Sequence, residues 1–166
     1  VLRDNTFGEQ HEDAARRDFT INAMYYDPAE QLVLDYHGGM NDIRNRTLRI
    51  IGEAEARYRE DPVRLLRVVR FSAKLEFKIA PATRQPMAVM APLINNVPVA
   101  RVFDEMLKLL QTGHALASVQ QLRQQGLAKG IYPLLDLVVE RADEPFITAA
   151  LQDTDRRGDR CLAMRR

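Results

Sequence analysis

The chain has 166 residues, of which 46% are hydrophobic and 28% charged, and its formal net charge at pH 7 is +1. This length and composition suit one compact domain, or parts of two, with a real core. No run of about 18 apolar residues predicts a membrane span, and the first residues lack the apolar segment of a signal peptide. The lone cysteine, Cys161, excludes an internal disulfide and a cysteine-based zinc cluster, so we expect a cytoplasmic protein.

The first predicted element is a helix that begins near Asp18, in the segment AARRDFTINAMYYD (14–27). Asp18 and Asn22 would then share one face, four residues apart, while Ile21 and its apolar neighbours point towards the core. A helix amino terminus beside Arg17 favours a phosphate. The alternative is that Asp18 only caps the helix and the arginines are solvated.

Two short strands are predicted next. QLVLDY (31–36) follows the turn signal DPAE and ends at two glycines, and TLRIIG (47–52) is a second β-rich run closed by glycine. Together they predict the edge of a small sheet. Asp35 and His37 lie close together in the turn HGG, but two side chains in a turn are more typical of a satisfied turn than of a metal site.

From about residue 61 the apolar residues recur at helical spacing, and Pro62 follows Asp61 as proline does in a first helical turn behind an acidic cap. Further helices are predicted at about 83–94, 99–111, 115–125, 131–141 and 145–154. The predicted fold class is therefore α+β, with short strands and helices first and an all-helical part after them.

A basic stripe is predicted on the helix that follows Asp61. Arg64, Arg67 and Arg70 recur every third residue, so they lie along one drifting face. Between residues 57 and 74 there are six basic side chains and two acidic ones, an excess of four that suggests a phosphate-bearing partner. A carboxylate at Asp61 beside a guanidinium can match the hydrogen-bonding edge of adenine. The alternative is a capped helix with a solvated basic face.

Three segments in succession resemble motifs of the bacterial class II nucleotidyltransferases, which comprise poly(A) polymerases and CCA-adding tRNA nucleotidyltransferases. They are RRDFTINA (16–23), DYHGGMNDIRNRTLRIIG (35–52) and RYREDPVRLLRVVRFSAKLEF (57–77). Within the family, VLRDNTFG (1–8), RYREDPVRLLR (57–67) and NNVPVARVFDEMLKLLQTG (95–113) look more like the poly(A) polymerases.

The resemblance implies a division near residue 54. Residues 1–54 would be the C-terminal portion of the nucleotidyltransferase head, and residues 55–166 the helical neck and the start of the body, which bind RNA and nucleotide. It assigns Asp18 to the active-site carboxylates and five other residues to the nucleotide: Arg17, Asn22, Asp61, Arg64 and Arg67. Arg17 and Asp18 would face the Asp61–Arg67 turn across one cleft.

The implied reaction is template-independent transfer of AMP from ATP to the 3′ end of RNA. The resemblance also implies Mg²⁺, whose glycine-rich strand and paired aspartates are expected upstream of Val1, since no equivalent pair occurs in the chain. We therefore expect residues 1–166 to be an excerpt that holds no metal and is inactive alone.

Three alternatives stay open at the level of sequence. CCA addition to tRNA uses the same motifs. A noncatalytic helical RNA-binding module would need the basic stripe but not Asp18, and a helical scaffold would need neither.

Overall fold

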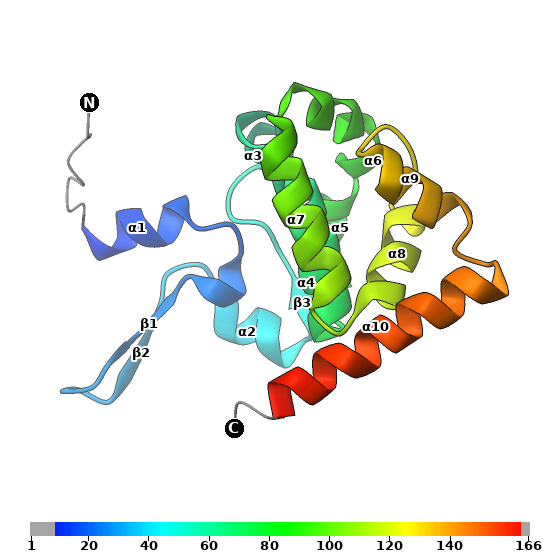
Figure 1. Cartoon of the computed structure of the whole chain (residues 1–166). Helices are drawn as coiled ribbons and strands as arrows, with labels where there is room; N and C mark the ends of the chain where they lie inside the picture. Colours follow the sequence, from blue (N-terminus) through cyan, green and yellow to red (C-terminus); the bar gives the residue numbers. More distant parts are fainter. Residues whose placement is uncertain (1–8, 164–166) are drawn as a thin grey trace.

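The structure is a computed structural model that describes residues 9–163, with side chains through residue 158. The segment 1–8, on which one part of the family resemblance depends, and the side chain of Cys161 lie outside the described residues. The predicted α+β class is confirmed, because short paired strands precede a largely helical region (Figure 1).

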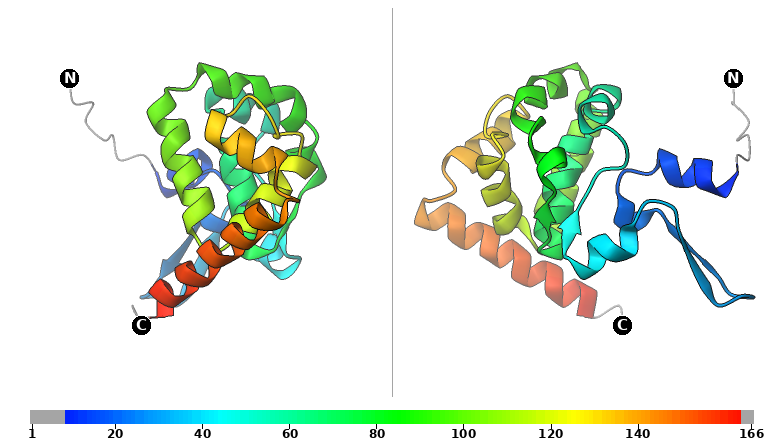
Figure 2. Two further views of the ribbon diagram at one scale, coloured as in Figure 1. Left: turned by 45° about the vertical axis from the view of Figure 1, so that its right-hand side comes forward. Right: turned by 180° about the vertical axis from the view of Figure 1, so that it is seen from behind.

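The first part of the chain combines short helices with a β-hairpin. Its elements are α1 (Gln10–Arg16), η1 (Thr20–Asn22), β1 (Met24–Asp27), β2 (Leu32–Asp35), α2 (Gly39–Arg44) and β3 (Thr47–Leu48). Strands β1 and β2 pair antiparallel, and the Asp27 carboxylate accepts the amide of Ala29 to close the turn between them. The hairpin extends away from the helices in Figure 1 and in the right view of Figure 2.

The helix predicted from Asp18 is wrong. Helix α1 ends before it, and the residues around Phe19 instead run antiparallel to the chain after β3. The carbonyl of Asp18 accepts the amide of Ile51, and the amide of Thr20 donates to the carbonyl of Arg49. This distant pairing holds the backbone extended, so only the single turn η1 forms, and Asp18 and Asn22 do not share a helix face.

The two predicted strands exist, but they do not lie in one sheet. QLVLDY contains β2, whereas TLRIIG contributes only Thr47–Leu48 as β3. Strand β2 pairs with β1, and β3 pairs in parallel with β4 (Lys78–Ile79). The partner of β3 follows a long helix, which brings a segment distant in sequence to this position.

The second part of the chain is almost entirely helical. Its helices are α3 (Ala54–Glu60), α4 (Arg64–Leu75), α5 (Pro81–Arg84), α6 (Met87–Met90), η2 (Ala91–Asn96), α7 (Val99–Gln111), α8 (Ala115–Gln124), α9 (Pro133–Glu140) and α10 (Pro145–Ala163). The predicted 99–111 helix is confirmed. The one predicted at 83–94 is divided into three short pieces, because Pro86 and Pro92 interrupt the backbone pattern. Helix α10 extends well beyond the predicted residue 154.

One hydrophobic core includes residues from both parts of the chain. Phe19, Leu48 and Ile50 pack in the same cluster as Leu65 of α4 and Leu122 of α8. Phe19 is fully buried, and its ring meets Phe71 edge to face with 5.3 Å between ring centroids. The strands near the predicted boundary at residue 54 are therefore packed directly onto α4.

Thr83 of α5 links the segment after β3 and helix α3 at one edge of this core. Its hydroxyl accepts the amide of Ile50 at 3.1 Å, and its carbonyl accepts the phenol hydroxyl of Tyr58 at 2.9 Å. Tyr58 is fully buried, and that burial raises the pKa of its hydroxyl strongly. The buried phenol is therefore a neutral donor that ties α3 to α5.

Substitution Tyr58→Phe tests this junction. It removes a donor and leaves the buried carbonyl of Thr83 without its partner, so we expect urea unfolding to show a loss of about 1–3 kcal/mol. Tyr26→Phe is the matched control, because Tyr26 is 62% exposed. An equal effect of the two substitutions would contradict a structural role for the Tyr58 hydroxyl.

Candidate functional site

The carboxylate of Asp18 lies between two arginines of α4. Its Oδ1 accepts Nε of Arg64 at 2.8 Å, and its Oδ2 accepts Nη1 of Arg67 at 2.6 Å. Both oxygens are thus engaged by separate guanidiniums in charge-assisted hydrogen bonds. The structure brings together three of the predicted site residues from positions more than 40 apart in sequence.

Arg64 is buried and extends this contact to α3. Its Nη1 donates to the carbonyl of Arg57 at 2.9 Å and to the carboxylate of Glu60 at 2.7 Å. Arg57 in turn donates to the backbone carbonyls of Arg16 and Arg17. Arginines of two successive helices therefore hold the backbone and the side chain of the 16–18 segment, which explains its fixed extended conformation.

Arg67 is the more accessible partner of Asp18. Its side chain is 31% exposed, compared with 9% for Arg64. Beyond it, Arg70 donates from Nε to Glu105 of α7 at 2.6 Å, and Glu105 also lies 3.9 Å from Nε of Arg67. The basic stripe is therefore lined by carboxylates, and its interpretation as a solvated face is wrong.

Asp61 lies in the turn between α3 and α4, where its two oxygens have different partners. Oδ1 accepts the amide of Val63 at 3.3 Å, and Oδ2 accepts Nη2 of Arg101 at 2.9 Å. Asp61 was predicted to cap the helix that begins behind Pro62, but α4 begins at Arg64 with Val63 as its N-cap, and Asp61 ends α3. Arg101, which belongs to α7, fixes the direction of the outer carboxylate oxygen.

Arg17 and Asn22 point elsewhere in the structure. Arg17 pairs with Asp13, lies over the ring of Tyr25, and donates to the carbonyl of Asn22. The side chain of Asn22 accepts the amide of Phe19, which closes η1. Among the described side chains, neither has a hydrogen bond or an ion pair to α4. The sequence analysis assigned Arg17 and Asn22 to the same site as Asp18. In the structure they are near Asp18 in the chain, but they do not contact Arg64 or Arg67.

Four residues of this network were missed from the sequence: Arg57, Glu60, Arg101 and Glu105. Glu105 carried a usable signal, because it is the one acidic residue among the buried positions of the 99–111 helix. A charge on an apolar helix face calls for a buried partner. Arg57 and Arg101 carried no such signal, because their partners depend on tertiary packing.

The described residues do not fit a divalent metal ion. They contain no cluster of three His, Cys, Asp or Glu side chains arranged to hold one. Both oxygens of Asp18 already accept hydrogen bonds from positively charged groups. In this arrangement Asp18 holds the two guanidiniums in place.

Comparisons with known proteins agree with this architecture. Residues 3–49 match a family described as the poly A polymerase head domain. Residues 76–138 match a family described as the probable RNA and SrmB-binding site of polymerase A. Poly(A) polymerase I of Salmonella typhi is 48% identical over 95% of this chain, and that of Haemophilus influenzae is 45% identical over the same share. The CCA-adding enzyme of Geobacillus stearothermophilus is 43% identical over 70% of the chain.

Solved structures show the same fold. The Bacillus stearothermophilus CCA-adding enzyme in complex with CTP is similar over 80% of this chain and 34% of its own, with a TM-score of 0.72 and 39% identity. A tRNA nucleotidyltransferase complexed with a primer tRNA and an incoming ATP analogue is similar over 79% of this chain and 40% of its own, with a TM-score of 0.70 and 29% identity.

Fold and sequence together make the chain a homologue of the class II nucleotidyltransferases, covering head and neck elements. Within that class it is homologous to bacterial poly(A) polymerase I across 95% of its length. The chain spans 35% of the length of the Salmonella typhi relative and 36% of the Haemophilus influenzae one.

The environment of Asp18 sets its ionisation. Partial burial disfavours the charged carboxylate, but hydrogen bonds from Arg64 and Arg67 outweigh that effect and lower the pKa of Asp18 below its usual range. A lowered pKa in the folded state means that the carboxylate stabilises the fold above the unfolded pKa of about 3.9. This contribution is lost as the pH falls through the folded pKa.

Substitution Asp18→Asn tests the contact directly. It removes the carboxylate charge that Arg64 and Arg67 share and leaves them only Glu60 and Glu105, so we expect a loss of about 2–4 kcal/mol at pH 7. The difference from the unsubstituted protein should begin to shrink below about pH 4, where Asp18 of the unfolded state takes up a proton, and should vanish as the pH falls through the lowered pKa of the folded state. Urea unfolding at pH 7 and near pH 3 measures both effects. Asp143→Asn, in an exposed ion pair with Arg123, is the control, and a difference that does not depend on pH would contradict the account.

Proposed function

We propose that the full-length protein containing this chain adds AMP from ATP to the 3′ ends of RNA without a template. The observation that carries this choice is the extent of homology. Poly(A) polymerase I of Salmonella typhi is 48% identical over 95% of the chain, whereas the CCA-adding enzymes of Geobacillus stearothermophilus and Bacillus subtilis are 43% and 38% identical over 70% and 82% of it. The Asp18 contact supports a nucleotide-binding role, because it fixes the guanidiniums of Arg64 and Arg67 beside the segment that carries Asp18.

The residues of the chain take separate roles in this proposal. Arg67 contacts the triphosphate, because it is the exposed member of the pair that holds Asp18. Arg64 is a positioning residue, since its donors are directed to Asp18, Glu60 and backbone. Asp18 is likewise a positioning residue, in place of the catalytic role expected from the sequence.

Asp61 reads the base. Its outer oxygen, held by Arg101, can accept the exocyclic amino hydrogen of adenine, and a neighbouring guanidinium hydrogen can be donated to a ring nitrogen. Arg17 lies one residue before Asp18 and is exposed, so it can add a further phosphate contact. Asn22 serves this arrangement by fixing η1, since its side-chain oxygen accepts the amide of Phe19 directly before that turn.

The reaction follows from these roles. The oxygen of the RNA 3′-hydroxyl attacks the α-phosphorus of ATP and its proton passes to solvent. A new phosphodiester bond forms, and the bond from the α-phosphorus to the oxygen that bridges it to the β-phosphate breaks to release pyrophosphate. The guanidinium of Arg67 offsets negative charge that develops on the phosphates. Mg²⁺ is proposed for the full-length protein by resemblance alone, and we derive no step from it because the described residues do not fit it.

RNA and ATP are accordingly the proposed partners, in RNA polyadenylation and mRNA processing, and the cytoplasm is the proposed location. None of the helices that the structure describes is both long and apolar enough to cross a membrane.

CCA addition to tRNA is the second candidate function. It is favoured by the solved structures, since the CCA-adding enzyme with CTP is 39% identical over the part that superposes. In that case the same Asp61 and arginines would accept cytosine as well as adenine.

Incubation with separate nucleotides distinguishes the two functions. The full-length protein is given ATP or CTP with generic RNA, and in parallel with tRNA that lacks its CCA end. We expect AMP to be added processively to generic RNA and CMP not to be added to either substrate. Addition of CMP to the tRNA would overturn the proposal, and residues 1–166 alone should add neither nucleotide.

Substitution Arg67→Ala tests the proposed triphosphate contact. Loss of a charge-assisted hydrogen bond is worth about 1.5–3 kcal/mol, so KM for ATP in the full-length protein should rise by about tenfold or more. Arg67→Lys should recover part of the loss, because it keeps the charge but not the forked geometry. Arg123→Ala, in an exposed pair far along the sequence, serves as the control. A KM unchanged by Arg67→Ala would show that the phosphates are held elsewhere.

A further inference from the structure

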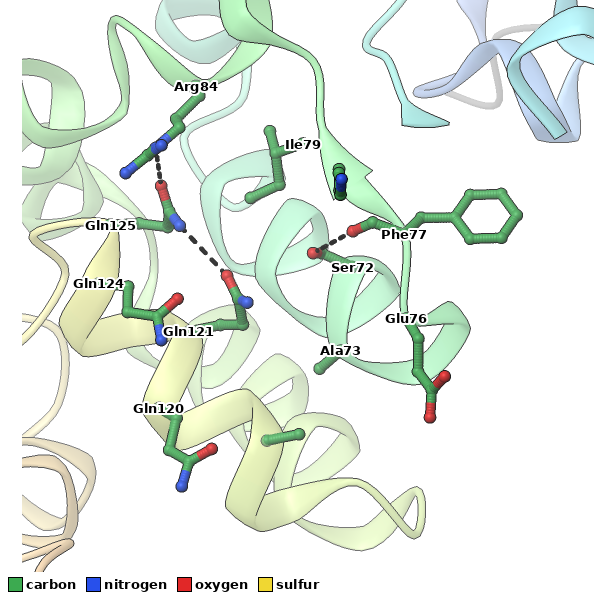
Figure 3. Close-up of a pocket in the computed structure, with 12 residues that line it drawn as sticks. Ser72, Ala73, Glu76, Phe77, Ile79, Arg84, Gln120, Gln121, Gln124 and Gln125 are labelled. Atoms are coloured by element: carbon green, nitrogen blue, oxygen red, sulfur yellow. Dashed lines mark hydrogen bonds between the residues drawn. The ribbon is translucent and has the colours of Figure 1, made fainter. Parts of the chain in front are cut away.

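A second polar site lies on the other side of α4. Successive residues of an α-helix turn by about 100°, so Ala73 lies on the side opposite Arg64. Ser72 is next to it in the chain, and Glu76 is the C-cap of α4. These three residues line a cavity of about 530 Å³ between α4, β4 and α8. The cavity is thus separate from the Asp18 contact, although the same helix forms part of both (Figure 3).

Glutamines of α8 form one wall of this cavity, which we call the glutamine groove. It is lined by Gln120, Gln121, Gln124 and Gln125, together with Lys78 and Arg84 across from them. The buried Gln125 accepts Nε of Arg84 at 2.9 Å and donates to Gln121 at 3.1 Å, so its amide is fixed in orientation. Figure 3 shows this chain of hydrogen bonds running across the cavity wall.

The other two amides have no partner among the described side chains. Gln120 and Gln124 project from the same helix beside the ordered chain, with Gln120 exposed to solvent (Figure 3). A free amide offers one acceptor and two donors, which is the pattern that pairs with the edge of an adenine base. The groove therefore presents ligand-directed hydrogen-bonding groups and not a closed internal network.

The charge of the groove is positive. Lys78 and Arg84 have no carboxylate partner among the described side chains, in contrast to Arg64, Arg67 and Arg70, each of which has one. Glu76, the acid at the edge of the groove, is paired with Arg46. Two unneutralised cations flanking a row of amides suit a ligand that carries phosphates and bases in alternation.

We infer that the glutamine groove binds an adenine-bearing stretch of single-stranded RNA, away from the 3′ end that reacts. The inference rests on the proposed function, in which the product is an adenylate tract that remains attached to the protein between additions. Lys78 and Arg84 hold phosphates, and Gln120 and Gln124 pair with base edges. These four residues fall within the segment 76–138, which matches the family described as a probable RNA and SrmB-binding site.

Two variants of the full-length protein test the groove. Lys78→Glu with Arg84→Glu reverses its charge, and Gln120→Ala with Gln124→Ala removes the free amides. The matched controls are Arg156→Glu and Gln152→Ala, exposed residues of α10. Binding is measured by fluorescence anisotropy with labelled 20-nucleotide oligo(A) and oligo(U).

The charge variant should weaken binding of both RNAs by about tenfold or more and reduce the salt dependence of affinity. The amide variant should lose most of the preference for oligo(A), and the controls should change little. KM for ATP on a primer too short to reach the groove should stay unchanged, which separates this site from the proposed active site.

The inference would be overturned if the groove variants bound both RNAs as tightly as the control variants do. This holds also if the groove variants fail to bind a protein partner instead. Because Arg84 holds the buried Gln125, Lys78→Glu alone is a second charge variant that leaves that contact intact. It should still weaken RNA binding severalfold. If it does not, the inference fails whatever the stability of the double variant.

Discussion

The carboxylate of Asp18, held between the guanidiniums of Arg64 and Arg67, is the contact on which the rest of the site depends. One anion contacts two cations, and a backbone hydrogen bond from Ile51, beyond the end of β3, fixes the segment that carries it. Removing the anion would leave positive charge in a partly buried place, where it is costly. The two arginines differ in their access to a ligand. The side chain of Arg64 is buried in the contact, whereas that of Arg67 is partly exposed.

Helix α4 has different chemistry on its two sides. One side carries arginines matched to Asp18 and to Glu105 of α7, so its charge is ordered by the protein itself. The other side borders a groove whose two cations are unmatched. A helix with fixed charges on one side and available charges on the other can hold a reacting nucleotide and an already formed strand at separate places.

The sequence predicted the chemistry of the site better than its backbone. Three motifs in order selected Asp18, Arg64 and Arg67 as candidates, and the structure shows these three side chains in contact. The 99–111 helix follows directly from its apolar spacing. The helix at Asp18 failed because local periodicity cannot register the antiparallel pairing of Phe19 with Ile50. The prediction that both strands share one sheet failed for the same reason, because β3 pairs with β4, which follows α4 in the chain. Arg101 could not be predicted, because its pairing with Asp61 depends on how α7 packs.

A double-mutant cycle between Asp18 and Arg67 tests the central contact most directly. Asp18→Asn, Arg67→Met and the combined variant are compared by urea unfolding at pH 7. Direct contact predicts that the two effects are not additive, with a coupling energy of about 1–3 kcal/mol. Losses that add within about 0.5 kcal/mol would contradict the account, because they would mean that Asp18 and Arg67 do not interact.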